Sequence, residues 1–229
     1  MERVIVQGEN MNKKQYKAVI FDLDGTLIDS MWVWQEIDKQ FLGKRNIPVP
    51  NNMDEVLEGK SFTESAQYFK ERFNLEMSVD EIKTEWNETA WEFYMHKVPL
   101  KKGVRKFLET LKVHNIKMGI ATSNSTELVG AVLKTLGVLE YFSEIKTSCE
   151  VGRGKPFPDI YLKVAENLEV DPSDCLVFED IANGVRAGKN AGMTVGCVKD
   201  RQPEDQWKEI VALADFSIED YEEVIEKLF

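Results

Sequence analysis

The 229-residue chain lacks several features that would indicate a function by themselves. No apolar run reaches the roughly 18–20 residues of a membrane-spanning helix, and no signal-peptide pattern opens the chain. Basic residues are in deficit, because 29 Lys and Arg against 40 Asp and Glu give a net charge of −11. This balance argues against binding to nucleic acid or to an anionic membrane, so we expect neither as a partner.

Cysteine and histidine are also scarce. The three cysteines, Cys149, Cys175 and Cys197, are odd in number and show no C-x-x-C spacing. This pattern favours reduced thiols and a cytoplasmic location. His96 and His114 neighbour no nucleophile and no paired metal ligand in the sequence, so we expect them at the surface or near a hinge.

Strand and helix patterns alternate from residue 98 onward. They predict strands at Lys117–Thr122, Glu144–Thr147, Cys175–Phe178, Met193–Val198 and near Ala214–Phe216. Helices are predicted between and after them at about Glu127–Leu136, Pro158–Leu168, Ile181–Asn190 and Ile218–Leu228. Strands separated by helices of this length form βαβ units. The sequence therefore predicts an α/β fold, a three-layer Rossmann-like core with a parallel sheet.

The segment 31–97 differs, because it contains helical patterns and no clear strand. Ser78 opens a capping box for a helix that reaches about His96, and Ser61 or Thr63 caps another that runs through Phe73. Four of the five tryptophans lie here, at Trp32, Trp34, Trp86 and Trp91. We expect an all-helical cap with its own aromatic cluster.

These patterns predict two structural units. Residues 1–30 and 98–229 would form the α/β core, and residues 31–97 the inserted cap. Hinges are expected around Leu27–Ser30 and Val98–Gly103, where the chain must reverse direction. Residues 1–10 are expected to be a dispensable lead-in, with Met11 as an alternative start.

Two carboxylates at the end of an apolar strand are the most informative pattern. The run Val19–Phe21 leads directly into Asp22-Leu23-Asp24-Gly25-Thr26. Open α/β sheets bind ligands at the carboxyl ends of their strands. Because buried, unpaired carboxylates are costly, such a pair should hold a cation or shift its pKa. The pattern indicates metal-assisted chemistry.

Three further polar segments are expected at strand ends. Ala121–Asn124 offers hydroxyl and backbone N–H groups for a phosphate oxygen. Gly154–Asp159 holds Lys155 between Gly and Pro, and Phe178–Asp180 ends a strand in two acids. Taken singly, each has a plainer interpretation as a helix cap or a solvated lysine. Together they supply acids for a metal, a fixed cation and donors for an anion, the set that phosphoryl transfer requires.

In order and spacing, these four segments resemble the haloacid dehalogenase superfamily, and the phosphatase and β-phosphoglucomutase-like members with a small helical cap in particular. The resemblance runs from Ala18 to the C-terminus, and its Asp-x-Asp-Gly-Thr motif is specific. True dehalogenases lack the second acid, which is Asp24 here. The resemblance implies a phosphatase that hydrolyses a small phosphomonoester, such as a sugar phosphate or a nucleotide.

The resemblance also implies roles for single residues. Asp22 would be the nucleophile that forms an aspartyl-phosphate, and Asp24 the general acid and base. Thr122, Ser123 and Asn124 would hold phosphate oxygens. Lys155 would offset the charge of the nucleophile and the phosphoryl group.

A magnesium ion is implied as cofactor. It would be held by the Asp22 carboxylate, the Asp24 backbone carbonyl and Asp180, with Glu179 orienting the hydrated metal. Without a cation, an anionic carboxylate could hardly approach an anionic phosphate.

The cap departs from the mutase-like pattern at two positions. Trp34 stands where those members carry a His, and Phe62 stands where they carry an Arg. Lys60 could replace that Arg in part, but an ammonium lacks the bidentate guanidinium fork. We therefore expect hydrolysis, with Trp32, Trp34 and Phe62 as walls of the substrate site.

Two other functions stay open at this point. A β-phosphoglucomutase-like isomerase would interconvert sugar phosphates without net release of phosphate. A phosphoacceptor module resembling a response-regulator receiver also combines acids, a hydroxyl and a Lys, but it is far shorter and has no cap. The expected partner is a small phosphorylated metabolite, and the expected oligomeric state is a monomer.

Overall fold

The computed structural model describes residues 15–228. The expected lead-in of residues 1–10 lies outside the described residues. No helix in the described part is both long and apolar enough to cross a membrane.

A six-stranded parallel sheet forms the centre of the molecule. Its strands lie in the order β3-β2-β1-β4-β5-β6. Their bounds are β1 Ala18–Phe21, β2 Lys117–Thr122, β3 Glu144–Thr147, β4 Cys175–Glu179, β5 Thr194–Val198 and β6 Phe216–Ile218. The order reverses at β1, which pairs with β2 on one side and β4 on the other. Such a reversal leaves a crevice beyond the carboxyl ends of the strands, and ligands bind there in doubly wound folds.

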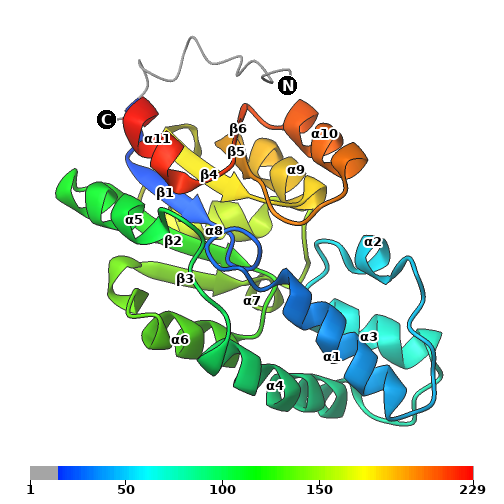
Figure 1. Cartoon of the computed structure of the whole chain (residues 1–229). Coiled ribbons are helices and arrows are strands. Elements are labelled where there is room, and N and C mark those ends of the chain that lie inside the picture. The colour runs from blue at the N-terminus through cyan, green and yellow to red at the C-terminus, as the bar shows by residue number, and fades with distance from the viewer. Residues whose placement is uncertain (1–14, 229) are drawn as a thin grey trace.

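Helices cover both faces of the sheet and make three layers (Figure 1). On one face lie α5 Val104–Val113, α6 Thr126–Thr135 and α11 Tyr221–Leu228. On the other lie α8 Asp159–Asn167, α9 Ala182–Asn190 and α10 Glu204–Leu213. Within β1, Val19 and Phe21 face the first layer while Ala18 and Ile20 face the second. This alternation is what a strand buried on both sides requires.

Five helices, α1–α5, lie between β1 and β2. The first four are α1 Met31–Gly43, α2 Met53–Leu57, α3 Phe62–Arg72 and α4 Val79–His96. Figure 1 shows them gathered at one end of the sheet, whereas α5 lies beside the strands. The remaining short elements are η2 Leu139–Tyr141, α7 Ser148–Val151 and η3 Pro172–Asp174.

Aromatic rings fill the interior of the helical unit α1–α4. Phe69 of α3 is fully buried and meets the rings of Phe41, Phe73 and Trp86 at centroid distances of 5.8, 5.3 and 4.8 Å. Edge-to-face pairs of this kind add to the free energy of burial. These rings belong to the same buried cluster as the side chains between the sheet and its first helical layer.

The two segments that join the helical unit to the sheet run side by side. The Asp29 amide donates to the Pro99 carbonyl at 3.0 Å, and the Lys101 amide donates to the Leu27 carbonyl at 2.9 Å. These are the segments expected to contain the hinges. The unit boundaries at residues 30 and 97 remain predictions.

The α/β class, the parallel sheet and the helical insertion are confirmed. The capping box at Ser78 begins α4 as expected, and of the two candidate caps for α3, Ser61 and Thr63, it is Ser61 that caps the helix. The last strand was misplaced, because Ala214 ends an unforeseen helix, α10, and β6 starts at Phe216. Ile218 belongs to β6, so the terminal helix begins at Tyr221 instead.

Helix α5 was not predicted either, although its sequence carries a helical pattern. Val104, Phe107, Leu108 and Leu111 recur at i, i+3, i+4 and i+7, and all four are buried. α10 carried less signal, because Ile210 is its one fully buried residue.

Replacing Phe69 with Ala should lower the free energy of unfolding by about 3–5 kcal/mol, because a large cavity would open in the aromatic core. Urea unfolding would measure the loss as a lower midpoint at unchanged slope. Val113→Ala is the control, since Val113 is 77% exposed and should change stability by less than about 0.5 kcal/mol. Equal effects of the two substitutions would contradict the packing described here.

Candidate active site

Three acids meet where β1 and β4 end. Asp22 directly follows β1, and its amide donates to the Phe178 carbonyl of β4 at 3.0 Å. Glu179 is the last residue of β4, and Asp180 follows it. One carboxylate oxygen from each of Asp22, Glu179 and Asp180 lies within 4.8 Å of the other two, and all three residues are buried. Parallel register therefore produces a carboxylate cluster from segments that lie far apart in the sequence.

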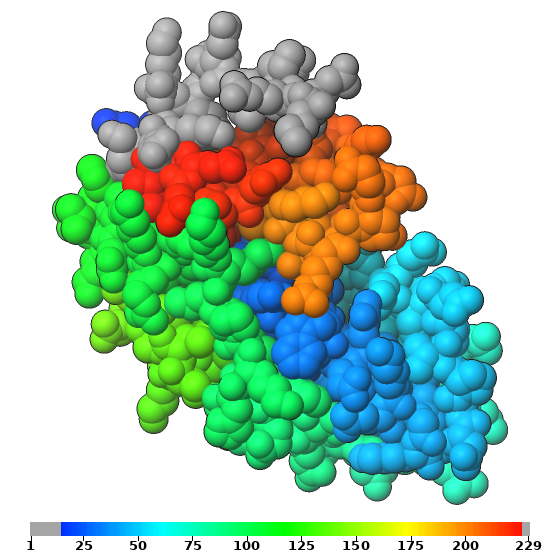
Figure 2. Space-filling view, viewed as in Figure 1, coloured from blue at the N-terminus to red at the C-terminus, as the bar shows by residue number. Residues whose placement is uncertain are grey.

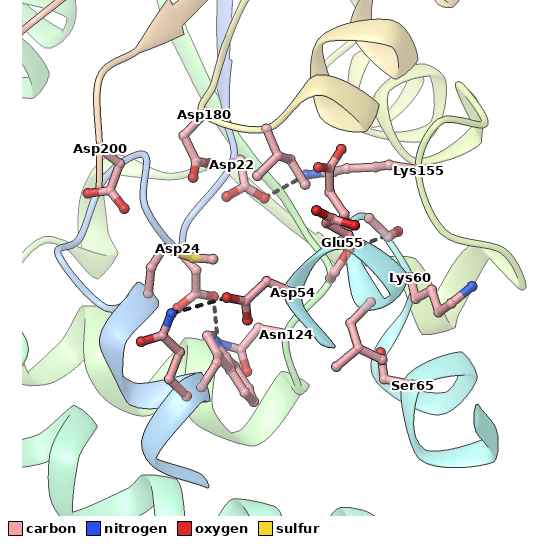
Figure 3. Close-up of a pocket in the computed structure, with 18 of the residues that line it drawn as sticks. Asp22, Asp24, Asp54, Glu55, Lys60, Ser65, Asn124, Lys155, Asp180 and Asp200 are labelled. Carbon is pink, nitrogen blue, oxygen red and sulfur yellow. Dashed lines mark hydrogen bonds and ion pairs between the residues drawn. The ribbon is translucent and has the colours of Figure 1, made fainter. Parts of the chain in front are cut away.

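Lys155 reaches this cluster from the loop before α8 (Figure 3). Its Nζ lies 2.6 Å from Asp22 Oδ1 and 2.5 Å from Glu179 Oε1, and its side chain is almost wholly buried. Tyr161 of α8 also donates to Glu179 Oε1, at 2.6 Å. Glu179 is thus occupied by protein donors, while Lys155 engages the Oδ1 atom of Asp22.

Burial and crowding govern the charges of these groups. Burial, with the nearby charges of Glu179 and Asp24, raises the pKa of Asp22 to about 8, although Lys155 opposes the rise. Burial and the charges of Asp22 and Glu179 raise the pKa of Asp180 well above its ordinary value. Burial alone would lower the pKa of Lys155, but the two carboxylates beside it raise it. One ammonium therefore faces three acids, which is too little positive charge for all three to ionise together unless a further cation binds.

The cluster suits a hard divalent cation. Carboxylate oxygens are the ligands that Mg²⁺ takes in proteins, and a cation would offset the charge that Lys155 leaves uncompensated. Gly25 keeps the space beside Asp180 open, because a Cβ at that position would lie 2.1 Å from Asp180 Oδ2. Thr26 fixes the other oxygen, Oδ1, by donating its hydroxyl at 2.9 Å.

Asp24 lies apart from the three-acid cluster and belongs to a different network. Its Oδ1 accepts hydrogen bonds from the Ser30 hydroxyl at 2.6 Å and from the Tyr94 hydroxyl. Its Oδ2 accepts one from the Asn124 amide at 2.7 Å. Burial raises the pKa of Asp24, while the donors Ser30, Tyr94 and Asn124 lower it. The side chain is thus oriented on both oxygens and biased toward its protonated form.

The polar residues at the end of β2 and just after it make different contacts. Thr122 is buried, and its hydroxyl oxygen accepts from the Asn124 amide N–H at 3.1 Å, which leaves its own proton available. The side-chain NH2 of Asn124 donates to Asp24 and Tyr94. The contact with phosphate expected of Asn124 would therefore have to be made by a different group of this residue. Ser123 lies 3.5 Å from the Gly59 carbonyl. The residue that caps α6 is Ser125.

A cavity of about 420 Å³ joins this site to the helical unit. Among the predicted residues, those that line it are Asp22, Asp24, Trp34, Lys60, Phe62, Thr122, Ser123, Asn124, Lys155 and Asp180. Glu179 lies behind them, fully buried. A cavity of this size accommodates a small metabolite. In the space-filling view, the segment after β5 lies against the start of α1 (Figure 2). Arg201 of that segment donates from its guanidinium to Asp29 Oδ2 at 3.1 Å.

One expectation about the cap needs correction, and it concerns Trp32. Trp32 is not among the lining residues, because its indole N–H donates to the Asp29 carbonyl and its ring packs on Phe93. Two residues apart on a helix, Trp32 and Trp34 point to different sides. Lys60 borders the cavity, but its ammonium is directed away from Asp22 and Asp24 (Figure 3).

Sequence reasoning missed several residues that border or support the site. Tyr94, which orients Asp24, is one of them. Lys101 holds the Gly25 carbonyl at 2.6 Å and Asp200 Oδ1 at 2.9 Å, but nothing local marks it. Asp38 and Trp86 also line the cavity. A usable signal did exist for Asp38, because Met31, Trp34 and Asp38 follow a helical spacing and share one face of α1.

Known proteins resemble this chain in both sequence and structure. A family model for haloacid dehalogenase-like hydrolases matches residues 16–192. Phosphorylated carbohydrates phosphatase of Thermotoga maritima is 31% identical over 177 residues, which cover 77% of this chain and 82% of that protein. The crystal structure of a putative β-phosphoglucomutase from Thermotoga maritima is 28% identical in sequence and superposes with a TM-score of 0.71. The match covers 93% of this chain and 100% of that chain.

A longer relative matches over part of its length. The bifunctional riboflavin kinase/FMN phosphatase of Arabidopsis thaliana is 35% identical over 187 residues, which cover 81% of this chain and 49% of that protein. The chain therefore spans about half the length of this relative. The family model, in contrast, spans most of the chain and includes both acids after β1, Lys155 and the acids that end β4. On this match, the chain belongs to the haloacid dehalogenase-like hydrolases, in the β-phosphoglucomutase/phosphatase subfamily with a helical cap.

Proposed function

We propose that the chain hydrolyses a small phosphomonoester through a covalent intermediate on Asp22. The observation that carries this proposal is the buried contact between Lys155 and Asp22, beside Asp180 and at the floor of a cavity for a metabolite. A buried carboxylate held by one ammonium at such a floor is positioned as a nucleophile. The helical unit supplies the rest of the cavity wall.

The first step forms the aspartyl-phosphate. An Asp22 carboxylate oxygen attacks phosphorus, and the bond from phosphorus to the leaving oxygen breaks. Lys155 lies 2.6 Å from Asp22 Oδ1, so it fixes the carboxylate and offsets charge as the phosphoryl group arrives. The Thr122 hydroxyl and the backbone after β2 would hold phosphoryl oxygens. The same residues then serve the second step.

Asp24 transfers the protons in both steps. Its raised pKa favours the protonated acid, which gives its proton to the leaving oxygen. As a carboxylate it then takes a proton from water, which attacks the phosphorus of the aspartyl-phosphate and releases phosphate. Ser30, Tyr94 and Asn124 hold Asp24 in one orientation throughout. Asp22 returns as a carboxylate.

Magnesium is the cofactor we propose for this site. When bound by Asp22, Asp180 and the Asp24 carbonyl, it would supply positive charge between the nucleophile and the phosphate anion. The Glu179 oxygens already accept hydrogen bonds, from Lys155 and Tyr161 on Oε1 and from the Asp180 amide on Oε2. We therefore place Glu179 as a support for Lys155 and the metal ligands.

The competing proposal is mutase activity, which the name of the related putative β-phosphoglucomutase favours. A mutase must hold a second phosphate while the substrate turns around. Lys60 is directed outward here, and Arg201 is paired with Asp29. Phe62 occupies the place of the expected Arg. Hydrolysis is therefore the better-supported function.

Replacing Asp22 with Asn should lower phosphate release by at least about a thousandfold, because the amide cannot form the intermediate. The assay would offer a panel of sugar phosphates, nucleotides and phospho-acids, with Mg²⁺ and with a chelator. Glu109→Gln on the exposed side of α5 is the matched control and should leave turnover unchanged. Interconversion of glucose phosphates on addition of a sugar bisphosphate, without phosphate release, would instead establish the mutase.

Mg²⁺ should stabilise the chain more at about pH 8 than at about pH 5. The pKa of Asp22 is raised to about 8, against about 3.9 in an unfolded chain. Between these values the folded chain keeps a proton that the unfolded chain releases, so the metal-free protein loses stability as the pH rises. At the lower pH, protons compete with the cation.

The measurement is the melting temperature with and without Mg²⁺ at both pH values. A concentration of about 100 times the dissociation constant would add about 2.7 kcal/mol. Asp180→Asn should abolish most of this gain, and Glu109→Gln should retain it. A Mg²⁺ effect equal in Asp180→Asn and the unmutated chain would rule out this site as its origin.

Tyr94→Phe should move the basic limb of the activity profile to higher pH. The Tyr94 hydroxyl donates to the Asp24 carboxylate and lowers its pKa, so its removal lets Asp24 stay protonated further up the pH scale. Loss of orientation should also reduce kcat by about tenfold. The pH dependence of kcat/KM would be compared with that of Tyr68→Phe, a partly buried tyrosine outside the cavity. An unshifted limb would show that Tyr94 does not act through Asp24.

A further inference from the structure

Asp38 is a buried carboxylate that the reaction does not use. It lies on α1, one helical turn after Trp34, and lines the cavity on the side of the helical unit. The residue is 8% exposed. Among the residues that the structure describes, no hydrogen bond and no ion pair reaches its carboxylate; only burial and the charge of Asp54 act on its pKa. Buried carboxylates without a donor are costly, and this one faces the space for the substrate.

A second carboxylate stands near it at the rim. Asp54 of α2 also lines the cavity, and its one partner among the described residues is the neutral Gln35 amide at 3.1 Å. Figure 3 shows Asp54 turned toward the middle of the cavity. Burial and the charge of Asp54 raise the pKa of Asp38 to about 7. Two acids without a cation between them favour a positively charged occupant.

Aromatic rings surround the same part of the cavity. Trp34 and Trp86 both meet Phe62, at centroid distances of 6.0 and 5.5 Å, and all three line the cavity. The Trp86 Nε1 atom is buried and has no hydrogen-bond partner. Ring faces attract cations, most strongly when water is excluded. Carboxylates framed by aromatic rings form a setting that recognises organic ammonium groups.

Protein cations do not compete for this place. Lys155 is committed to Asp22 and Glu179, and Arg201 lies against Asp29. Lys60 is directed away from the acids of the site (Figure 3). Among the described lining residues these are the only Lys and Arg side chains. The charge on Asp38 and Asp54 is therefore left for the substrate to offset.

We propose that Asp38, with Asp54 beside it, binds an ammonium group on the leaving-group part of the substrate. The proposal rests on the proposed phosphatase function and narrows it to amine-bearing phosphomonoesters. Phosphate would occupy the Lys155 end of the cavity and the ammonium the Asp38 end. A second phosphate or a carboxylate at the Asp38 end would meet like charge and be disfavoured.

Matched pairs of substrates test this proposal without assuming the distance between the Lys155 end and the Asp38 end of the cavity. The pairs are ω-aminoalkyl and ω-hydroxyalkyl phosphates with roughly two to six carbons, so that one length places the end group near Asp38. We expect kcat/KM for the amine to exceed that for the alcohol by about tenfold or more at the best length. Asp38→Asn should lower kcat/KM for the amine far more than for the alcohol of the same length, and so remove this advantage. Asp54→Asn should reduce it in part.

Controls separate the possible failures. Glu36→Gln changes a carboxylate of the same helix that does not line the cavity, so it should keep the amine preference. Equal turnover of amines and alcohols at every length, or an amine preference that survives Asp38→Asn, would overturn the Asp38 assignment while the phosphatase stands. Failure to release phosphate from either series and from p-nitrophenyl phosphate would refute the phosphatase function itself.

Discussion

The ion cluster of Lys155 with Asp22 and Glu179 is the constraint on which the rest of the site depends. Three buried acids share one buried ammonium, and such a group survives only when every oxygen has a fixed donor or a cation. Two glycines serve this requirement by giving the carboxylates room. A Cβ at Gly184 would lie 2.0 Å from the Glu179 carboxyl carbon, and one at Gly25 would lie 2.1 Å from an Asp180 oxygen. Tyr161, buried in α8, supplies a further donor to Glu179.

The same cluster links the sheet to the helical unit. The Lys155 amide donates to the Gly59 carbonyl at 2.7 Å, so the loop that carries the ammonium is fastened to the segment before α3. Glu64 accepts from the Gly154 amide at 3.0 Å, and Glu58 accepts from the Asn183 amide at 2.8 Å. On the opposite side, Tyr94 of α4 reaches Asp24. We infer that a displaced cap would leave both Lys155 and Asp24, the proposed general acid, without part of their support, which would couple closure to catalytic competence.

The sequence was sufficient to predict the parts of the site that lie at strand ends. An apolar run that stops at Asp22, or at Glu179 and Asp180, marks both the strand and the acid, and parallel pairing then brings such ends together. Tyr94 and Lys101 were beyond this reasoning, because each acts on a residue about 70 positions away and neither interrupts a local pattern. Asn124 was identified as a residue of the site, but its amide turned out to serve Asp24. Sequence patterns indicate which residues meet at the site. Which donor pairs with which acceptor around Asp24 depends on how α4 packs.

The charges of the cavity separate the chemistry from the choice of substrate. The groups proposed to act on phosphorus come from strand ends of the sheet and, for Lys155, from the loop before α8. Trp34, Asp38, Asp54 and Phe62 come from the helical unit. A change in the helical unit can therefore alter which leaving group binds without moving the nucleophile. The phosphate end is acidic only until a divalent cation offsets it, but the Asp38 end has no such metal cluster among the described residues. On our proposal, the acids at that end would therefore still disfavour substrates with a second anion after the metal binds.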